Sequence, residues 1–303
     1  MLASVSADFT AKVWDIEKGS EIAAIPVADQ LLQDINWDYT GSVFATSSKD
    51  KTVRICDPRG GEVVQEIPNA HEGAKSIKLT YLGKKNKFVT LGFTRQSQRQ
   101  IKLWDPANLS APLKTEQIDQ AAGVIIPYYD DDTNVLYLAG KGDGNIRYYE
   151  IVDENPLLFK LSEYRSTVAA KGIGFVPKRG LDIMKCETAR ALKLTQKTIE
   201  PLSFIVPRKS DAFQEDIFPP TFAGIPGCTS DEWQAGANPT CSKISLDPAG
   251  GGQTVSAEAA APMPAMKTRT QLQGELDKAN EYIATLTAAL QAASIEVPPS
   301  PAP

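Results

Sequence analysis

The sequence predicts an all-β fold built from repeated four-stranded propeller blades, and three observations support this prediction. A Trp-Asp-like string recurs, as VWD at 13–15, ICD at 55–57, LWD at 103–105 and YYE at 148–150. Its aromatic or cysteine residue repeats at intervals of 42, 48 and 45 residues, which is the period of a WD40 blade. Short apolar or alternating runs, bounded by turn residues, fill each interval.

Each unit also carries residues that suit a blade. The residues at the repeating position are Trp14, Cys56, Trp104 and Tyr149. Three units place an aspartate six residues earlier, where a carboxylate can cap the tight turn between two strands: Asp8, Asp50 and Asp143. The third unit reads QSQRQ at 96–100 instead and so departs from the pattern. His71, in the string NAHEG, is expected to bond within its own blade.

The predicted blades occupy residues 1–207. At roughly 42 residues per blade they amount to about four and a half blades. A propeller closes as a ring, because an open ring exposes edge strands and half of a core. We therefore expect further blades upstream of Met1, roughly a hundred residues or more.

The composition and the spacing of apolar residues change at two points in the C-terminal part. Residues 251–266 are rich in Gly, Ala and Pro and predict a flexible linker. Residues 267–296 then show a heptad seam with spacings of four and three: Leu272, Leu276, Ala279, Ile283, Leu286, Leu290 and Ala293. This pattern favours a coiled coil that self-associates over a lone helix lying on the propeller. Dimer, trimer and tetramer all remain open, and residues 297–303 form a Pro-rich tail.

Composition excludes several classes of protein. The net charge is −5, and residues 211–303 carry 4 basic and 11 acidic side chains, which is unlike a nucleic-acid-binding protein. No apolar run reaches the roughly 18 residues of a membrane-spanning helix, and no signal-peptide pattern is present. The four cysteines form no CxxC pair, which is typical of free thiols in the cytoplasm.

We find no pattern that indicates catalysis, a metal site or a cofactor. The chain has one histidine, and no nucleophile motif accompanies it. The string AGKGDG at 139–144 lacks the P-loop lysine and hydroxyl positions, so we interpret it as a blade turn. The sequence therefore predicts a protein that is not an enzyme.

One charged run is a candidate binding surface. Residues 73–104 contain no acidic residue, and their basic side chains include Lys84, Lys85, Lys87, Arg95 and Arg99. A solvated face of no special function is an equally good interpretation. The alternative is a basic patch that meets an acidic partner and makes binding sensitive to salt.

Three strings carry a resemblance to a known family: GFVPKRGLDIMKCETAR at 174–190, IEPLSFIVPRKSDAFQEDIFPPT at 199–221 and, more loosely, DEWQAGANP at 231–239. With the blade strings upstream, the chain resembles the coronin family of WD-repeat proteins from residue 2 to about 240. The resemblance implies a seven-bladed propeller, an extension at 208–250 that packs back onto it, and a C-terminal coiled coil.

The same resemblance implies a function. Coronins bind actin filaments, regulate the actin cytoskeleton and engage the complex that nucleates branched actin. A principal actin contact of the family is a basic residue in the N-terminal part that finds no match here, so it maps onto no position. On this basis Lys84, Lys85, Lys87, Arg95 and Arg99 are the candidate actin contacts. The alternatives are a WD-repeat scaffold for membrane traffic or signalling that does not bind actin, and a fragment without function.

Overall fold

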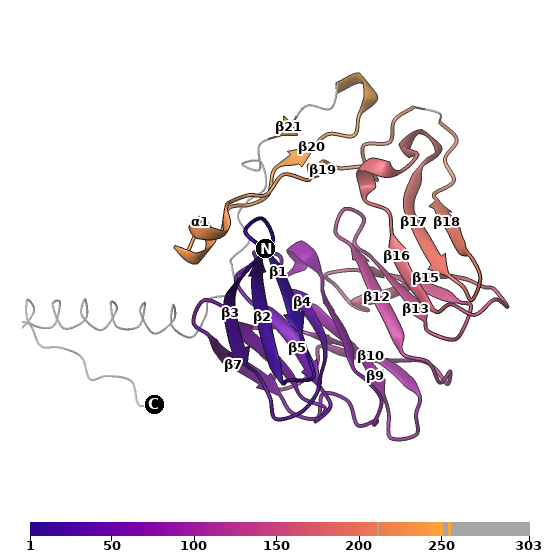
Figure 1. The fold of residues 1–303 in the computed structure, drawn as a ribbon. Coiled ribbons are helices and arrows are strands. Elements are labelled where there is room, and N and C mark those ends of the chain that lie inside the picture. The colour runs from indigo at the N-terminus through magenta and orange to yellow at the C-terminus, as the bar shows by residue number, and fades with distance from the viewer. Residues whose placement is uncertain (211, 251–253, 256–303) are drawn as a thin grey trace, which may run out of the picture. The chain divides into compact units, whose positions relative to one another are not determined.

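The computed structural model describes residues 1–210, 212–250 and 254–255. Over these residues, eighteen strands form five consecutive antiparallel sheets, which we number as blades 1 to 5 in chain order (Figure 1). Blade 1 has three strands: β1 (Leu2–Val5), β2 (Thr10–Asp15) and β3 (Ser20–Pro26). Blade 2 has four: β4 (Leu32–Trp37), β5 (Phe44–Ser48), β6 (Val53–Asp57) and β7 (Glu62–Ile67).

The later blades follow the same plan. Blade 3 comprises β8 (Lys78–Tyr81), β9 (Phe88–Phe93), β10 (Arg99–Trp104) and β11 (Lys114–Asp119). Blade 4 comprises β12 (Ile125–Asp130), β13 (Val135–Gly140), β14 (Ile146–Ile151) and β15 (Leu158–Tyr164). Blade 5 has three strands: β16 (Gly172–Phe175), β17 (Glu187–Leu194) and β18 (Ile199–Ile205). Eighteen strands equal four and a half four-stranded blades, as the repeat length predicts.

The blades stand side by side through their first strands. β8 contacts β4 on one side and β12 on the other, and β12 also contacts β16. The hydrophobic core is accordingly divided into layers between adjacent blades. Val43 and Ile55 of blade 2 pack in one layer with Leu79 and Phe88 of blade 3. Leu91 of blade 3 belongs to the next layer, where it packs with residues of blade 4. Because the central strands are covered on both faces, strands such as β5 and β9 are buried throughout.

A repeated turn joins the second and third strands of blades 2 to 5 and the first two strands of the three-stranded blade 1. In blades 1 and 2 the carboxylates of Asp8 and Asp50 accept backbone N–H groups two residues on, at 3.1 and 2.9 Å. Asp143 accepts in the same way at 2.8 Å in blade 4. These carboxylates satisfy turn donors that would otherwise need water. Blade 3 has Gln96 at the corresponding place, directly before the left-handed residue Ser97.

Short helical turns interrupt the sheets at the end where the first and second strands of each blade meet. They are η1 (Gly83–Lys85) in blade 3 and η2 (Lys178–Gly180) and η3 (Ile183–Lys185) in blade 5. They shape the surface that the segment after blade 5 crosses.

Residues 221–244, which we call the strap, run back across this end of the blades (Figure 1). The strap contains β19 (Thr221–Phe222), the helix α1 (Ser230–Gln234) and β20 (Lys243–Ile244). Beyond it lie η4 (Pro248–Gly250) and β21 (Thr254–Val255), and β21 pairs with β20. Two residues of the predicted linker are therefore part of a small sheet. The remaining linker residues, the predicted coiled coil at 267–296 and the Pro-rich tail lie outside the described residues.

Candidate functional site

The lysines of the predicted basic patch form ion pairs with blade 4. Lys84 and Lys85 belong to η1 and Lys87 follows it, at the end of blade 3 that the strap crosses. The Nζ atom of Lys84 lies 3.2 Å from a carboxylate oxygen of Asp131. Asp153 receives both Lys85, at 2.7 Å, and Lys87, at 3.8 Å. These contacts join blade 3 to blade 4 and balance much of the positive charge.

Arg95 lies at the opposite end of the same blade, in the turn between β9 and β10. Its side chain is 80% exposed, and its nearest acidic partner is Glu72 at 3.7 Å. An exposed ion pair at this distance is weak. Arg95 is therefore available to a partner, but on a different surface from Lys84, Lys85 and Lys87.

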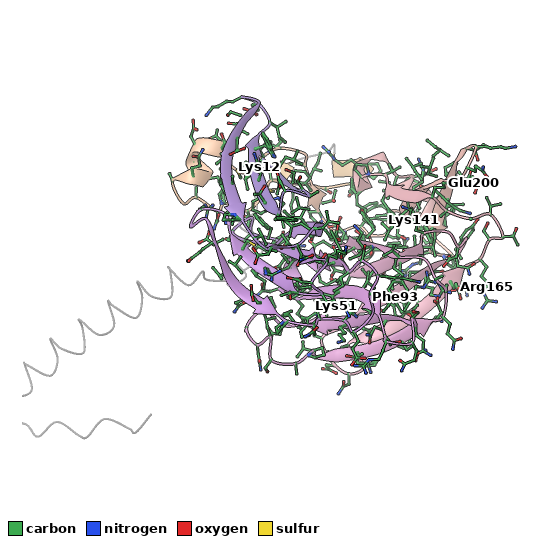
Figure 2. The ribbon with its side chains drawn as sticks, turned by 60° about the horizontal axis from the view of Figure 1, so that its bottom comes forward. Lys12, Lys51, Phe93, Lys141, Arg165 and Glu200 are labelled. Carbon is green, nitrogen blue, oxygen red and sulfur yellow. The ribbon has the colours of Figure 1, made fainter. Side chains whose placement is uncertain are left out.

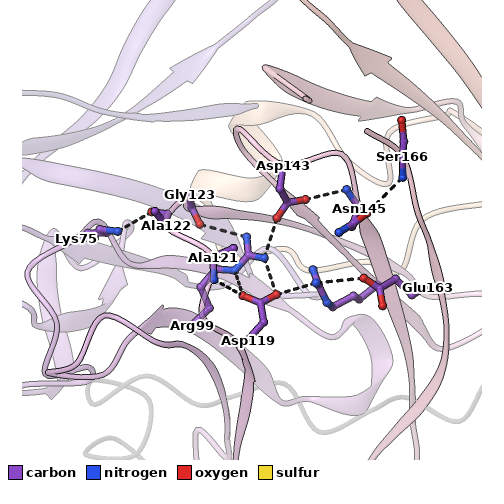
Figure 3. Close-up of polar contacts among 11 residues, drawn as sticks. Lys75, Arg99, Asp119, Ala121, Ala122, Gly123, Asp143, Asn145, Glu163 and Ser166 are labelled. Atoms are coloured by element: carbon purple, nitrogen blue, oxygen red, sulfur yellow. Dashed lines mark hydrogen bonds and ion pairs between the residues drawn. The ribbon is translucent and has the colours of Figure 1, made fainter. Parts of the chain in front are cut away.

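Arg99 does not belong to any docking surface, which corrects the expectation from the sequence. Its side chain is completely buried. Nε and Nη2 donate to the two carboxylate oxygens of Asp119, each at 2.6 Å, and Nη2 also lies 2.7 Å from Asp143 (Figure 3). Its guanidinium thus ties blade 3 to the turn of blade 4. A side chain held in this way cannot contact a filament.

The ion pairs continue from Asp119 across blade 4. Arg147 on β14 lies 2.8 Å from Asp119 and 3.1 Å from Glu163 on β15. Burial alone would raise the pKa of Asp119, but the hydrogen bonds and charge of Arg99 outweigh burial and lower it. This carboxylate stays ionised, as a buried ion pair requires.

His71 is buried within blade 3, and its ring shares a hydroxyl group with a tryptophan. Nε2 lies 2.8 Å from Oγ1 of Thr90, which also accepts the indole N–H of Trp104 at 2.9 Å. Burial, aided by the nearby charge of Lys102, lowers the pKa of His71 to about 3. The imidazole is neutral at physiological pH and has no access to solvent, so it serves the packing of the blade.

The helix α1 anchors one end of the strap to blades 1 and 2. A capping box between Thr229 and Glu232 starts this short helix. Trp233 is only 2% exposed, and its indole N–H donates to the carbonyl of Gly41 at 2.8 Å. The ring meets Trp37 edge-on, with centroids 6.0 Å apart. Burial of an aromatic ring with its polar atom satisfied makes a strong anchor.

Polar contacts reinforce this anchor. The hydroxyl of Ser230 donates to the carboxylate of Asp15 in blade 1, and this bond lowers the pKa of Asp15 to about 2. The guanidinium of Arg59 lies over the Trp233 ring at 4.5 Å and donates to the carbonyl of Ala237 at 2.9 Å. The only sequence signal for these contacts was the string DEWQAGANP.

The other end of the strap lies on blades 3 to 5. Arg179 of η2 donates to the carbonyl of Ala223. The ammonium group of Lys243 sits close to that of Lys84, and burial together with this neighbouring charge lowers the pKa of Lys243. The strap therefore links the first two blades to blades 3 and 5.

A cavity of about 620 Å³ lies between the strap and the blades. Its wall includes Tyr39, Tyr129, Phe222 and Trp233. Acidic and basic side chains are nearly balanced in its wall, with Asp38, Asp130, Asp131 and Asp132 against Lys178, Arg179 and Lys243, and Lys178 pairs with Asp130 at 2.5 Å. The cavity consequently gathers no excess of one charge that would select a ligand.

The described part of the chain contains no cluster of three or more His, Cys, Asp or Glu side chains suited to a metal ion. Its four cysteines are free, with Cys56 and Cys186 buried. Among the same residues, none of the helices has the length and apolarity needed to cross a membrane.

Comparisons with known proteins identify the family. The chain is 40% identical to coronin-A of Dictyostelium discoideum over 265 residues, which cover 88% of this chain and 58% of that protein. It is 42% identical to human coronin-2A, over 82% of this chain and 48% of the relative. It is 46% identical to the coronin-like protein crn1 of Schizosaccharomyces pombe, over 78% and 39% respectively. The chain belongs to the coronin family.

Two further comparisons agree with the fold. A family model described as a type of WD40 repeat matches residues 199–241, which hold β18 and much of the strap. The crystal structure of the WD40 domain from Toxoplasma gondii coronin superposes with a TM-score of 0.77 at 33% identity, covering 81% of this chain and 64% of that one. The predicted WD40 propeller fold is thereby confirmed. This coronin spans about half the length of the curated relatives that it matches.

Proposed function

We propose that this coronin binds actin filaments and regulates the organisation of the actin cytoskeleton, without catalysing a reaction. The observation that carries the proposal is the 40–46% identity to coronins over most of the chain, together with the filament binding that the family resemblance implies. Buried ion pairs between blades favour a rigid body that presents many turns at fixed positions. Such a body suits the recognition of a large protein surface.

We further propose that residues 267–296 join several propellers. The seam residues Leu272, Leu276, Ala279, Ile283, Leu286 and Leu290 lie outside the described residues, so this proposal rests on the heptad spacing. Two or more linked propellers gain effective concentration on a polymer of identical subunits. Bundling of filaments is the expected result, and engagement of the branched-actin nucleating complex belongs to the same proposal.

Co-sedimentation of the 303-residue chain with actin filaments tests filament binding. We expect the chain to pellet with filaments in a saturable manner, and less of it to pellet as salt increases. A chain that stays in the supernatant at every filament concentration would contradict the proposal and favour the scaffold interpretation.

A seam variant of the full chain tests the second part. Leu276→Asn, Ile283→Asn and Leu290→Asn together place polar groups at every a position of the seam. We expect low-speed sedimentation of filament bundles to fall several-fold while high-speed co-sedimentation changes little. An equal loss of both would argue against linkage through the seam.

A further inference from the structure

One end of the blades carries both the turns between second and third strands and the connections to the next blade, and we call it the turn face. Backbone hydrogen bonds hold each turn to a connection. Lys49 donates to the carbonyl of Leu31 at 2.8 Å, and Lys141 donates to the carbonyl of Val124 at 2.8 Å. Figure 2 turns this end toward the viewer and labels Lys51, Lys141 and Arg165.

Exposed basic side chains repeat along the turn face, one turn after another. The turns of blades 2 to 5 each carry at least one: Lys49, Arg95, Lys141 and Lys197. The connections between blades add further exposed bases: Lys75, Arg165 and Lys171. A regular fold therefore places positive charges at blade intervals along one surface.

Most of these charges are not balanced locally, although Arg95 lies 3.7 Å from Glu72 and Arg165 lies 3.6 Å from Glu163. The acidic groups of the turns point inward and already have partners, since Asp50 pairs with Arg54 at 2.7 Å and Asp143 pairs with Arg99 at 2.7 Å. Within the part of the chain that the structure describes, Lys49, Lys141, Lys171 and Lys197 form no ion pair.

The exposed acids of this face are few. They are Asp8 and Asp29 on the blade 1 side, Glu66, which pairs with Arg54 at 2.8 Å, and Glu72, which faces Arg95 at 3.7 Å. The positive surface accordingly extends over blades 2 to 5 and ends at blade 1.

The end of the blades opposite the turn face differs in its covering and in the pairing of its charges. The strap crosses it, and Lys84, Lys85 and Lys87 are paired there, as Lys85 is with Asp153 at 2.7 Å. A partner that approached there would have to displace the strap or break ion pairs.

We propose that the turn face is the surface of this coronin that contacts the actin filament. This inference rests on the filament binding proposed above and assigns it to particular residues. An actin filament is an acidic polymer, so attraction to the turn face speeds encounter and orients the propeller before close contact. Arg99, buried behind this face, fixes the position of the blade 4 turn and acts as a positioning residue.

A matched pair of charge-reversal variants of the full chain tests the assignment. The turn-face variant carries Lys49→Glu, Arg95→Glu, Lys141→Glu and Lys197→Glu. The control variant carries Lys114→Glu, Lys160→Glu, Lys185→Glu and Lys209→Glu, which change the net charge equally at exposed or half-buried sites away from the turn face. Filament co-sedimentation in about 0.05 M salt gives the affinities, and thermal unfolding checks that both variants fold.

We expect the turn-face variant to bind filaments at least about tenfold more weakly than the unaltered chain, and the control variant to bind within about threefold of it. Equal binding by both variants would overturn the assignment and leave filament binding intact. Failure of the unaltered chain itself to bind would instead overturn the proposed function.

A second arm distinguishes a lipid partner. Vesicles of phosphatidylcholine with about one fifth phosphatidylserine replace the filaments in the same assay. If the turn-face substitutions abolish vesicle binding but leave filament affinity unchanged, the face recognises an anionic membrane and the assignment is wrong. Loss of filament affinity supports it whatever the vesicles show.

Discussion

Blades 2 and 3 place very different residues at one equivalent position. Val53 begins the third strand of blade 2 and pairs with Ser47, while Arg99 begins the third strand of blade 3 and pairs with Phe93. Both side chains are completely buried. Blades 1 and 4 have Ala11 and Ile146 at this position, so a buried apolar residue is the rule and Arg99 is the exception.

The turns of the two blades differ in a related way. In blade 2, Asp50 accepts the N–H of Thr52 and pairs with Arg54, so the turn is satisfied within the blade. Blade 3 has no turn aspartate, and its arginine reaches Asp143 in the turn of blade 4. The copy that lacks the turn aspartate is therefore bonded to the turn of the next blade through a buried arginine. Departures from a repeat pattern can mark connections between repeats, not only loss of the motif.

The largest expected effect on stability comes from replacing Arg99 with alanine, compared with the same replacement of Val53. Arg99→Ala leaves Asp119 and Asp143 close together without their shared cation, and we expect it to lower the free energy of unfolding by about 3–5 kcal/mol. Val53→Ala, at the equivalent position, should cost about 2 kcal/mol through lost apolar burial. Urea denaturation monitored by tryptophan fluorescence measures both.

Neutralising the partners sharpens this test. Arg99→Val combined with Asp119→Asn and Asp143→Asn removes the cation and both anions, and should recover much of the stability that Arg99→Ala loses. If Arg99→Ala and Val53→Ala cost the same, the link between blades 3 and 4 contributes nothing beyond ordinary packing.

The pH dependence of stability provides the next contrast, because blade 3 buries His71 beside Thr90 and Trp104, whereas blade 2 contains no histidine. The pKa of folded His71 is about 3, against about 6.5 when unfolded. The unfolded state therefore takes up the proton first, so this stability is present above about pH 6.5 and is lost as pH falls. We expect a loss of about 2 kcal/mol between pH 6.5 and 5.

His71→Gln supplies the control for that experiment. His71 is the single histidine of the chain, so no other imidazole contributes. Urea midpoints measured from pH 7 to 5 should fall for the unaltered chain and change much less for the variant. Parallel curves would mean that His71 is accessible to protons in the folded state.

A smaller effect is expected for the ion pair within blade 2. Arg54 contacts Asp50 at 2.7 Å and Glu66 at 2.8 Å, but the Glu66 side chain is half exposed. Water can therefore replace part of what Arg54→Ala removes, and we expect a cost of about 1 kcal/mol. A loss as large as that of Arg99→Ala would show that pairs within and between blades contribute alike.

The smallest effect tests whether blade 3 tolerates the missing turn residue. Gln96→Asp restores the carboxylate that Asp8 and Asp50 supply in blades 1 and 2. We expect a gain of at most about 0.5 kcal/mol, because the N–H of Gln98, which the new carboxylate would accept, already donates to Oγ1 of Thr94 at 3.1 Å. Differential scanning calorimetry detects such a gain as a small rise in Tm, and a fall would indicate that the turn of blade 3 has a different geometry.

Spacing within the sequence was enough to predict the blades. The period from Trp14 to Tyr149 follows from the strands and turns that every copy needs, and these depend on neighbouring residues. The turn role of Asp8 and Asp50 is local in the same sense, since each carboxylate bonds two residues away.

The candidate site was harder to predict because its residues act across blades. The burial of Arg99 depends on Asp119 and Asp143, 20 and 44 residues away, and the pairing of Lys85 depends on Asp153, 68 residues away. A run of bases in the sequence therefore separated in space into paired, buried and exposed groups. The basic residues of the turns could be recognised as a repeating set only after the blades had been aligned with one another.

The anchoring of Trp233 has a consequence for biosynthesis. Its bond to Gly41 spans 192 residues of chain, and ribosomes add about 5–20 residues per second. Blades 1 and 2 therefore emerge roughly 10–40 seconds before the side chain that covers their shared apolar surface. During that interval the nascent chain exposes an apolar surface beside Trp37, which is the kind of surface that chaperones recognise.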